Sequence, residues 1–87
     1  MAGYEKAPRQ VVEVRYVGDY RVWLQFNNGR KGLVDLADDL RGEILEPLRD
    51  PQRFAQLYLD RDLATIAWEH GAAFTPEYLY QKLVTVH

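Results

Sequence analysis

Residues 11–36 read VVEVRYVGDYRVWLQFNNGRKGLVDL, and this stretch decides the fold. Apolar and polar side chains alternate from Val11 to Val17 and from Tyr20 to Phe26, as in strands that bury one face. A third such run, from Arg30 to Leu36, follows the turn residues Asn27-Asn28-Gly29. The pattern predicts a three-stranded antiparallel meander.

The side chains also indicate how the second and third strands pair, because a slip of one residue moves a whole strand to the other face. A three-residue loop with Gly29 in the left-handed conformation pairs Val22 with Val34 and Trp23 with Leu33. A two-residue loop instead places apolar side chains opposite charged ones. The preferred register also pairs Tyr20 with Leu36 and Arg21 with Asp35.

For the first hairpin, the same reasoning predicts a loop at residues 17–19. This loop pairs Val14 with Val22 and Val12 with Leu24. One face of the meander then carries the apolar side chains of the core: Val12, Val14, Tyr16, Tyr20, Val22, Leu24, Phe26, Val34 and Leu36.

The chain beyond the meander predicts a short helix and a second hairpin. Asp50 can cap a helix over residues 51–57, and Pro51 suits its first position. Strand-like runs at Tyr58–Asp60 and Leu63–Glu69 then predict a hairpin, with Ala64, Ile66 and Trp68 on one face.

A last helix is predicted from Pro76 to Leu83. Thr75 is its expected cap, and Pro76 again suits the first position. Leu79 and Leu83 lie four residues apart, so both can dock on the sheet. The complete prediction is an α+β fold: a three-stranded meander, a short helix, a further hairpin and a C-terminal helix.

Length and composition indicate one small domain. The 87 residues are 47% hydrophobic and 28% charged, which is typical of a single globular core. We expect a single α+β domain over residues 10–83, preceded by a loose segment, residues 1–9. No apolar run approaches the roughly 20 residues that span a bilayer, and the N-terminus does not resemble a signal peptide. A cytoplasmic protein with no membrane partner is therefore expected.

The composition removes several kinds of active site. Cys and Ser are both absent, so the chain has no disulfide, no thiolate zinc site and no serine or cysteine nucleophile. His70, beside Glu69 and near Asp60 and Asp62, is a candidate general base or metal ligand. Because the only other histidine is the terminal His87, we interpret His70 as a turn residue.

A second candidate is the group of acids Asp35, Asp38, Asp39 and Glu43, whose oxygens could hold Mg²⁺ or Ca²⁺. Their spacing matches no calcium loop. Asp35 has a cross-strand partner in Arg21, and Asp38 or Asp39 is expected to cap a turn. We therefore predict no metal, no cofactor and no catalytic residue, and we expect that the protein is not an enzyme.

The outer face of the predicted meander is the candidate partner-binding surface. Its basic and aromatic side chains could stack on bases and hold phosphates. Glu13 and Asp35 share the face, however, and a Trp opposite a Leu more often marks packing or a protein interface. The surface consists of Arg15, Arg21, Trp23, Gln25, Lys31 and Leu33.

The charge distribution is uneven. Residues 1–34 carry six Lys and Arg against three Asp and Glu, whereas residues 35–50 carry two Arg against six acids. A nucleic-acid footprint is normally more basic than a chain with a net charge of −2 allows. The basic first third nevertheless keeps nucleic-acid binding open as an alternative.

Four segments, in this order, resemble the bacterial family catalogued as domain of unknown function 2442. The resemblance covers about residues 10–83 and implies a small α+β domain. The implied domain is similar to the N-terminal domain of a Nitrosomonas protein, in which a helix-turn-helix module follows that domain. His70 and Ala73 depart from the family pattern, where Asn and Asp are usual, so a site that uses those residues in relatives would be missing here. The segments are residues 20–29 (YRVWLQFNNG), 33–36 (LVDL), 46–51 (EPLRDP) and the stretch from Ile66-Ala67-Trp68 to Tyr80.

Some members of that family are encoded beside another small protein, in an arrangement read as a toxin-antitoxin pair. The resemblance therefore implies an antitoxin-like or regulatory member of a two-protein system. From residues and resemblance together we expect a non-catalytic protein–protein interaction module, which binds another small protein or a second copy of itself. The alternative is a nucleic-acid-binding or transcription-associated accessory domain.

Overall fold

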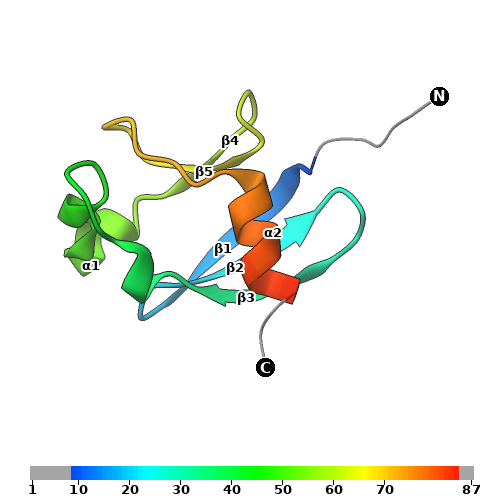
Figure 1. Cartoon of the computed structure of the whole chain (residues 1–87), viewed down its shortest axis with the longest axis horizontal. Helices are drawn as coiled ribbons and strands as arrows, with labels where there is room; N and C mark the ends of the chain where they lie inside the picture. The colour runs from blue at the N-terminus through cyan, green and yellow to red at the C-terminus, as the bar shows by residue number, and fades with distance from the viewer. Residues whose placement is uncertain (1–8, 85–87) are drawn as a thin grey trace.

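Three antiparallel strands form the larger sheet of the computed structural model, which describes residues 9–84 (Figure 1). Strand β1 spans Val11–Gly18, β2 spans Arg21–Phe26 and β3 spans Lys31–Asp35, and their order in the sheet is β1-β2-β3. The predicted meander is confirmed. Of the predicted loose segment, residues 1–8 lie outside the described residues.

The predicted register of β2 with β3 is confirmed. Residues 27–29 form the loop, which the Phe26 N–H closes by donating to the Arg30 carbonyl at 2.8 Å. Gly29 adopts a φ of +92°, a conformation that suits glycine. The pairs include Arg21 with Asp35, Val22 with Val34 and Trp23 with Leu33.

The predicted register of the first hairpin is wrong. Val14 lies opposite Leu24 instead of Val22, because the turn consists of Asp19 and Tyr20 and not of residues 17–19. Both turn residues have positive φ, 55° and 62°. This tight turn matches the twist of the strands, but it normally uses Asn and Gly, so the sequence carried no signal for it.

Strand β1 is irregular near both ends, where Val12 and Val17 interrupt the pairing. An extra residue in one strand changes which side chains face the core. As a result Val11 is buried, whereas Val12 is 43% exposed. The prediction that Val12 belongs to the core is therefore wrong.

The connection after β3 contains two short 3₁₀ helices, η2 (Ala37–Asp39) and η3 (Glu46–Arg49). Helix α1 follows at Pro51–Phe54 and is shorter than predicted. The side chain of Asp50 caps it as expected, accepting a hydrogen bond of 3.0 Å from the Gln52 N–H.

The second hairpin consists of β4 (Tyr58–Asp60) and β5 (Thr65–Ala67). Ala64, which was expected on the face of a strand, lies instead in the turn with a φ of +57°. All three residues of β5 are buried, so the strand does not show the predicted alternation.

Helix α2 (Pro76–Val84) crosses the meander in Figure 1. Thr75 caps it as predicted, since its hydroxyl accepts a hydrogen bond of 3.2 Å from the Tyr78 N–H. Leu79 is fully buried, and Leu83 lies over Gly32 so closely that a Cβ at Gly32 would be 2.6 Å from it. The helix therefore docks on the core face of β3.

The ring of Phe54 joins the two halves of the core. Its centroid lies 5.2 Å from that of Tyr20 on the meander and 5.4 Å from that of Trp68 beyond β5. The Trp68 indole N–H donates to the Phe54 carbonyl at 3.0 Å, so its polar atom is satisfied although the residue is buried. Among the described residues, no helix is both long and apolar enough to cross a membrane.

Candidate functional site

The side chains on the outer face of the meander form three rows across the strands. They alternate with buried residues such as Val22, Leu24 and Val34, which point into the core on the other face. The structure therefore brings together all six residues of the predicted surface. The rows are Arg21 and Asp35; Arg15, Trp23 and Leu33; and Glu13, Gln25 and Lys31.

The middle row provides the apolar part of this surface. Trp23 is half-buried and Leu33 is 45% exposed, and the two residues lie directly opposite each other on β2 and β3. Helix α2 lies on the other face of the sheet, where Leu83 meets Gly32. An aromatic and an aliphatic side chain are thus displayed at the centre of the face.

The charged side chains of this face are held only loosely by one another. Arg15 lies 3.7 Å from Glu13, and Arg21 lies 3.8 Å from Asp35. All four side chains are about half exposed or more, and such surface pairs contribute little to stability. These groups can therefore turn toward a partner at little cost.

His70 lies in the turn after β5, as predicted. Its Nε2 is 2.9 Å from the Ile44 carbonyl, a contact that ties the turn to the long connection. Asp60 is occupied elsewhere, because its Oδ1 accepts from the N–H groups of Asp62 and Leu63 at 2.9 and 3.1 Å. The structure therefore does not gather these acids around the imidazole.

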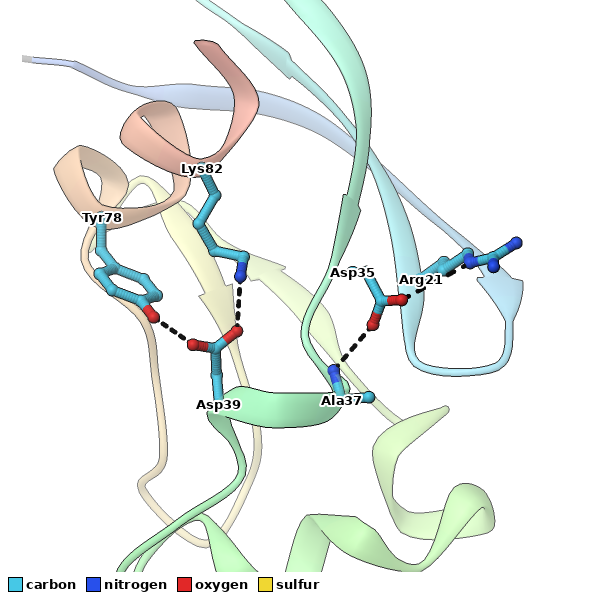
Figure 2. Close-up of polar contacts among 6 residues, drawn as sticks. All are labelled: Arg21, Asp35, Ala37, Asp39, Tyr78 and Lys82. Atoms are coloured by element: carbon cyan, nitrogen blue, oxygen red, sulfur yellow. Dashed lines mark hydrogen bonds and ion pairs between the residues drawn. The ribbon is translucent and has the colours of Figure 1, made fainter. Parts of the chain in front are cut away.

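The acids Asp35, Asp38, Asp39 and Glu43 are not gathered into one site either. Asp35 accepts a hydrogen bond of 2.9 Å from the N–H of Ala37, the first residue of η2 (Figure 2). Asp38 and Glu43 are exposed. Within residues 9–84, no three of the His, Asp and Glu side chains are arranged to hold a metal ion.

Asp39 has a role that the sequence did not reveal. Figure 2 shows its carboxylate between two side chains of α2. Lys82 Nζ lies 2.8 Å from Oδ2, and the Tyr78 hydroxyl donates to Oδ1. Asp38 or Asp39 was expected to cap a turn, but the carboxylate of Asp39 instead anchors the helix. Tyr78 and Lys82 are four residues apart and so lie on one face of the predicted helix. This spacing was the sequence signal that the two side chains could share one acceptor.

The hydrogen bond to Asp39 raises the pKa of Tyr78 above its ordinary value. Burial of the phenol and the negative charge of Asp39 act in the same direction. The phenol of Tyr78 therefore keeps its proton to a higher pH than a free tyrosine does.

A second cluster that the sequence did not reveal surrounds Tyr80. The Arg9 guanidinium lies 3.9 Å from the centre of the Tyr80 ring, and the Asn28 amide donates to its hydroxyl at 3.1 Å. The hydrogen bond from Asn28, together with the nearby Arg30 and Arg9, lowers the pKa of Tyr80. No carboxylate among the described residues forms an ion pair with either arginine.

The structure also contains an open cleft of about 560 Å³ between η3, α1 and the turn after β5. Leu48 and Trp68 are buried beside it, and both are already packed in the core. The other lining side chains are polar or charged: Arg53, Gln56, Glu69 and His70.

Comparison with known proteins places this fold among uncharacterised domains. The family model described as a protein of unknown function (DUF2442) matches residues 11–85. The solved structure "Putative DNA Binding Protein NE0471" from Nitrosomonas europaea ATCC 19718 is similar, with a TM-score of 0.74 and 24% sequence identity. The similarity covers 86% of this chain and 48% of the other, so this chain spans about half the length of that protein. No curated protein matches the chain.

Proposed function

This chain belongs to the DUF2442 family of proteins of unknown function, and we propose that it is a non-catalytic protein–protein interaction module. The observation that carries the proposal is the middle row of the outer sheet face. There Trp23 and the 45% exposed Leu33 lie side by side on a rigid sheet. Aromatic side chains ringed by polar groups are the usual anchors of protein interfaces.

The charges around Trp23 and Leu33 favour a protein partner with its own polar groups over a partner whose contact surface is entirely apolar. Three basic side chains and two acidic ones surround Trp23 on the face. A polar rim of both signs favours one orientation of a partner and excludes wrong ones. The partner that fits is a small protein with an apolar knob and a mixed, slightly acidic rim.

We propose no catalytic role for the chemically capable side chains. A catalytic site needs a nucleophile or base, a group that orients it and a place for the substrate. Asp35, Asp39 and Asp60 are each engaged by backbone or side-chain donors that stabilise turns or the helix. His70 contacts a backbone carbonyl and no carboxylate.

The finer proposal is that the chain is the antitoxin-like or regulatory member of a two-protein system. It is supported by the family resemblance and by a surface suited to holding another small protein. Such a module would act by covering or positioning its partner, which requires no chemistry of its own.

The test is a tagged pull-down of the full chain from its native host, with and without nuclease. A stoichiometric protein should be captured by wild type and lost with Trp23→Ala. Tyr58→Ala is the matched control, because it removes another aromatic side chain, 41% exposed, away from the face. Capture that survives Trp23→Ala, or that disappears on nuclease treatment, contradicts the proposal.

Nucleic-acid binding is the second candidate, and the cluster around Tyr80 favours it. Arg9 lies over the ring of Tyr80 and Arg30 lies near its hydroxyl, and basic groups beside an aromatic ring are the combination that holds phosphates and stacks on bases. The similar Nitrosomonas structure is described as a putative DNA binding protein, which agrees with this alternative, although the likeness at 24% identity shows the fold alone.

A titration of labelled single-stranded and double-stranded DNA at several salt concentrations tests this alternative. Binding should weaken steeply with salt, and Arg9→Ala/Arg30→Ala should reduce both the affinity and the salt dependence. Arg53→Ala/Arg61→Ala is the control, since it removes the same charge elsewhere on the surface. Equal losses in the two double variants would argue against a specific site.

A further inference from the structure

We propose that the chain forms a symmetric dimer through the edge of β3, in which Lys31 of each copy pairs with Asp35 of the other and the two Leu33 side chains meet at the axis. The dimer joins two meanders into one six-stranded antiparallel sheet. Its backbone contacts lie at the edge of the sheet, and its side-chain contacts come from Lys31, Leu33 and Asp35, which also stand on the outer face. Trp23, one strand further in on β2, takes no part in it.

The backbone of β3 has the hydrogen-bonding groups that this pairing needs. Two hydrogen bonds show which backbone groups of this strand point toward β2: the Phe26 N–H donates to the Arg30 carbonyl, and the Leu36 N–H donates to the Tyr20 carbonyl. The N–H and C=O groups of the even-numbered residues of β3 therefore point toward β2. In an antiparallel ladder the residues between them turn their N–H and C=O groups to the other side. Apart from the pairing with β2, no hydrogen bond within residues 9–84 reaches the backbone N–H or C=O groups of Lys31, Leu33 or Asp35.

The same three residues carry self-complementary side chains. If two β3 strands pair antiparallel about Leu33, Lys31 lies opposite Asp35 in both halves of the dimer. The hydrogen-bonded pairs then join residue 31 to 35, 33 to 33 and 35 to 31, which are the residues whose backbone groups point outward. Backbone and side chains therefore select the same register.

The charges also exclude the parallel alternative. A parallel pair in register places Lys31 beside Lys31 and Asp35 beside Asp35, and like charges opposite each other are destabilising. A slip of two residues in the antiparallel pair leaves a lysine or an aspartate opposite Leu33. Only the two-fold antiparallel arrangement gives Lys31 and Asp35 an opposite charge and Leu33 an apolar side chain to face.

The opposite edge of the sheet is protected, which makes β3 the edge available for pairing. Strand β1 is interrupted at Val12 and Val17, and bulges of this kind block edge-to-edge association. Its Val11 N–H also donates to the Ala64 carbonyl at 2.8 Å. Strand β3 has no irregularity in its register with β2.

The first experiment is sedimentation velocity of the full chain over a wide range of concentration. Wild type should show a reversible monomer–dimer equilibrium. Lys31→Glu should raise the dimer dissociation constant by roughly tenfold or more, because it places two acids opposite each other twice. Arg61→Glu, an equal charge change in the β4–β5 turn, should have no effect. A wild type that is monomeric throughout overturns the proposal.

The decisive experiment mixes two variants that do not dimerise alone. Asp35→Lys places two lysines opposite each other and should also be monomeric. In a mixture of Lys31→Glu and Asp35→Lys, however, residue 31 of each copy faces a residue 35 of opposite charge in the other. A heterodimer should therefore form. Mixing that restores no dimer contradicts the edge pairing.

Asp35 also accepts a hydrogen bond from the Ala37 N–H and pairs with Arg21, so Asp35→Lys is first checked for folding by circular dichroism. If it does not fold, Leu33→Cys replaces it in a chain that has no other cysteine. Residues in a hydrogen-bonded antiparallel pair lie about 5.5 Å apart, within disulfide reach. Oxidation should link Leu33→Cys efficiently and Leu63→Cys, an exposed control, poorly; equal yields contradict the proposal.

The dimer and the proposed partner can be tested separately. Trp23 lies on β2, one strand in from the edge, so Trp23→Ala should abolish partner capture and leave the dimer unchanged. A dimer lost with Trp23→Ala would place the contact on the outer face and overturn the edge pairing.

Discussion

Asp39 shows how much of the structure can depend on one side chain. It is 14% exposed and accepts from both Tyr78 and Lys82, so it joins η2 to α2 across 43 residues of sequence. A partly buried carboxylate with two donors is stronger than the pairs on the outer face, because fewer water molecules compete for it.

Asp39→Ala should therefore lower the free energy of unfolding by about 1–3 kcal/mol, because two donors lose their acceptor. Asp38→Ala is the matched control: Asp38 is exposed, and its removal should change stability by less than about 0.5 kcal/mol. Urea unfolding followed by circular dichroism measures both. Similar losses for the two variants would show that the contact with α2 does not matter.

The raised pKa of Tyr78 predicts a pH dependence. A group whose pKa is higher in the folded state contributes stability that is fully present below the unfolded pKa, here 10.0, and is lost as pH rises through the folded pKa. The stability advantage of wild type over Tyr78→Phe should thus be constant below about pH 10 and shrink as the pH rises above it. Tyr80, whose pKa is lowered, is common to both proteins and cancels in the difference. An advantage that stays constant with pH would contradict this account.

Whole elements differ in how far they could be predicted, and the reason is the range of the interactions that define them. Residues 27–29 specify their loop locally, so the register of β2 with β3 was predictable. The turn at Asp19 and Tyr20 was not, because its backbone depends on a contact with Phe54 far along the chain.

The candidate surface followed the same rule. Its residues could be placed on one face because alternation along each strand is a local signal. Asp39 and the cluster at Tyr80 were missed because they join segments that are distant in the sequence. The edge dimer rests on a pattern that was visible all along, a lysine and an aspartate placed symmetrically about Leu33.

The docking of α2 depends mainly on Leu79, which is fully buried. Leu79→Ala should lower the free energy of unfolding by about 2–5 kcal/mol, the range for a leucine removed from a packed core. Leu63→Ala, at a leucine that is 54% exposed, should cost less than about 0.5 kcal/mol. Thermal and urea unfolding measure both, and a small loss for Leu79→Ala would mean that α2 is held by other contacts.

The molecule as a whole has one core, since Phe54 contacts the ring of Tyr20 in the β1–β2 turn and that of Trp68 just after β5. Its two tryptophans report on different parts of it: Trp68 is buried and Trp23 lies on the outer face. A domain of this size should unfold in a single cooperative step.

Single-tryptophan variants test this cooperativity. In Trp23→Phe, the fluorescence of Trp68 should follow the same urea transition as the circular dichroism of the strands, because both report the same core. In Trp68→Phe, Trp23 fluorescence should be quenched readily by iodide in the folded state. Two separate transitions would show that the β4–β5 half unfolds by itself.

The left-handed backbone at Tyr20 also bears on the order in which the strands assemble. A non-glycine residue in this conformation costs about 1–2 kcal/mol, and here the ring packs on Phe54 while the hydroxyl donates to the Arg49 carbonyl. The β1–β2 turn therefore gains its support only when residues 49–54 arrive. The loop at residues 27–29 needs no such help and can close within microseconds. We expect β2 and β3 to form the early hairpin of the folding nucleus, and β1 to join as the second half of the chain condenses.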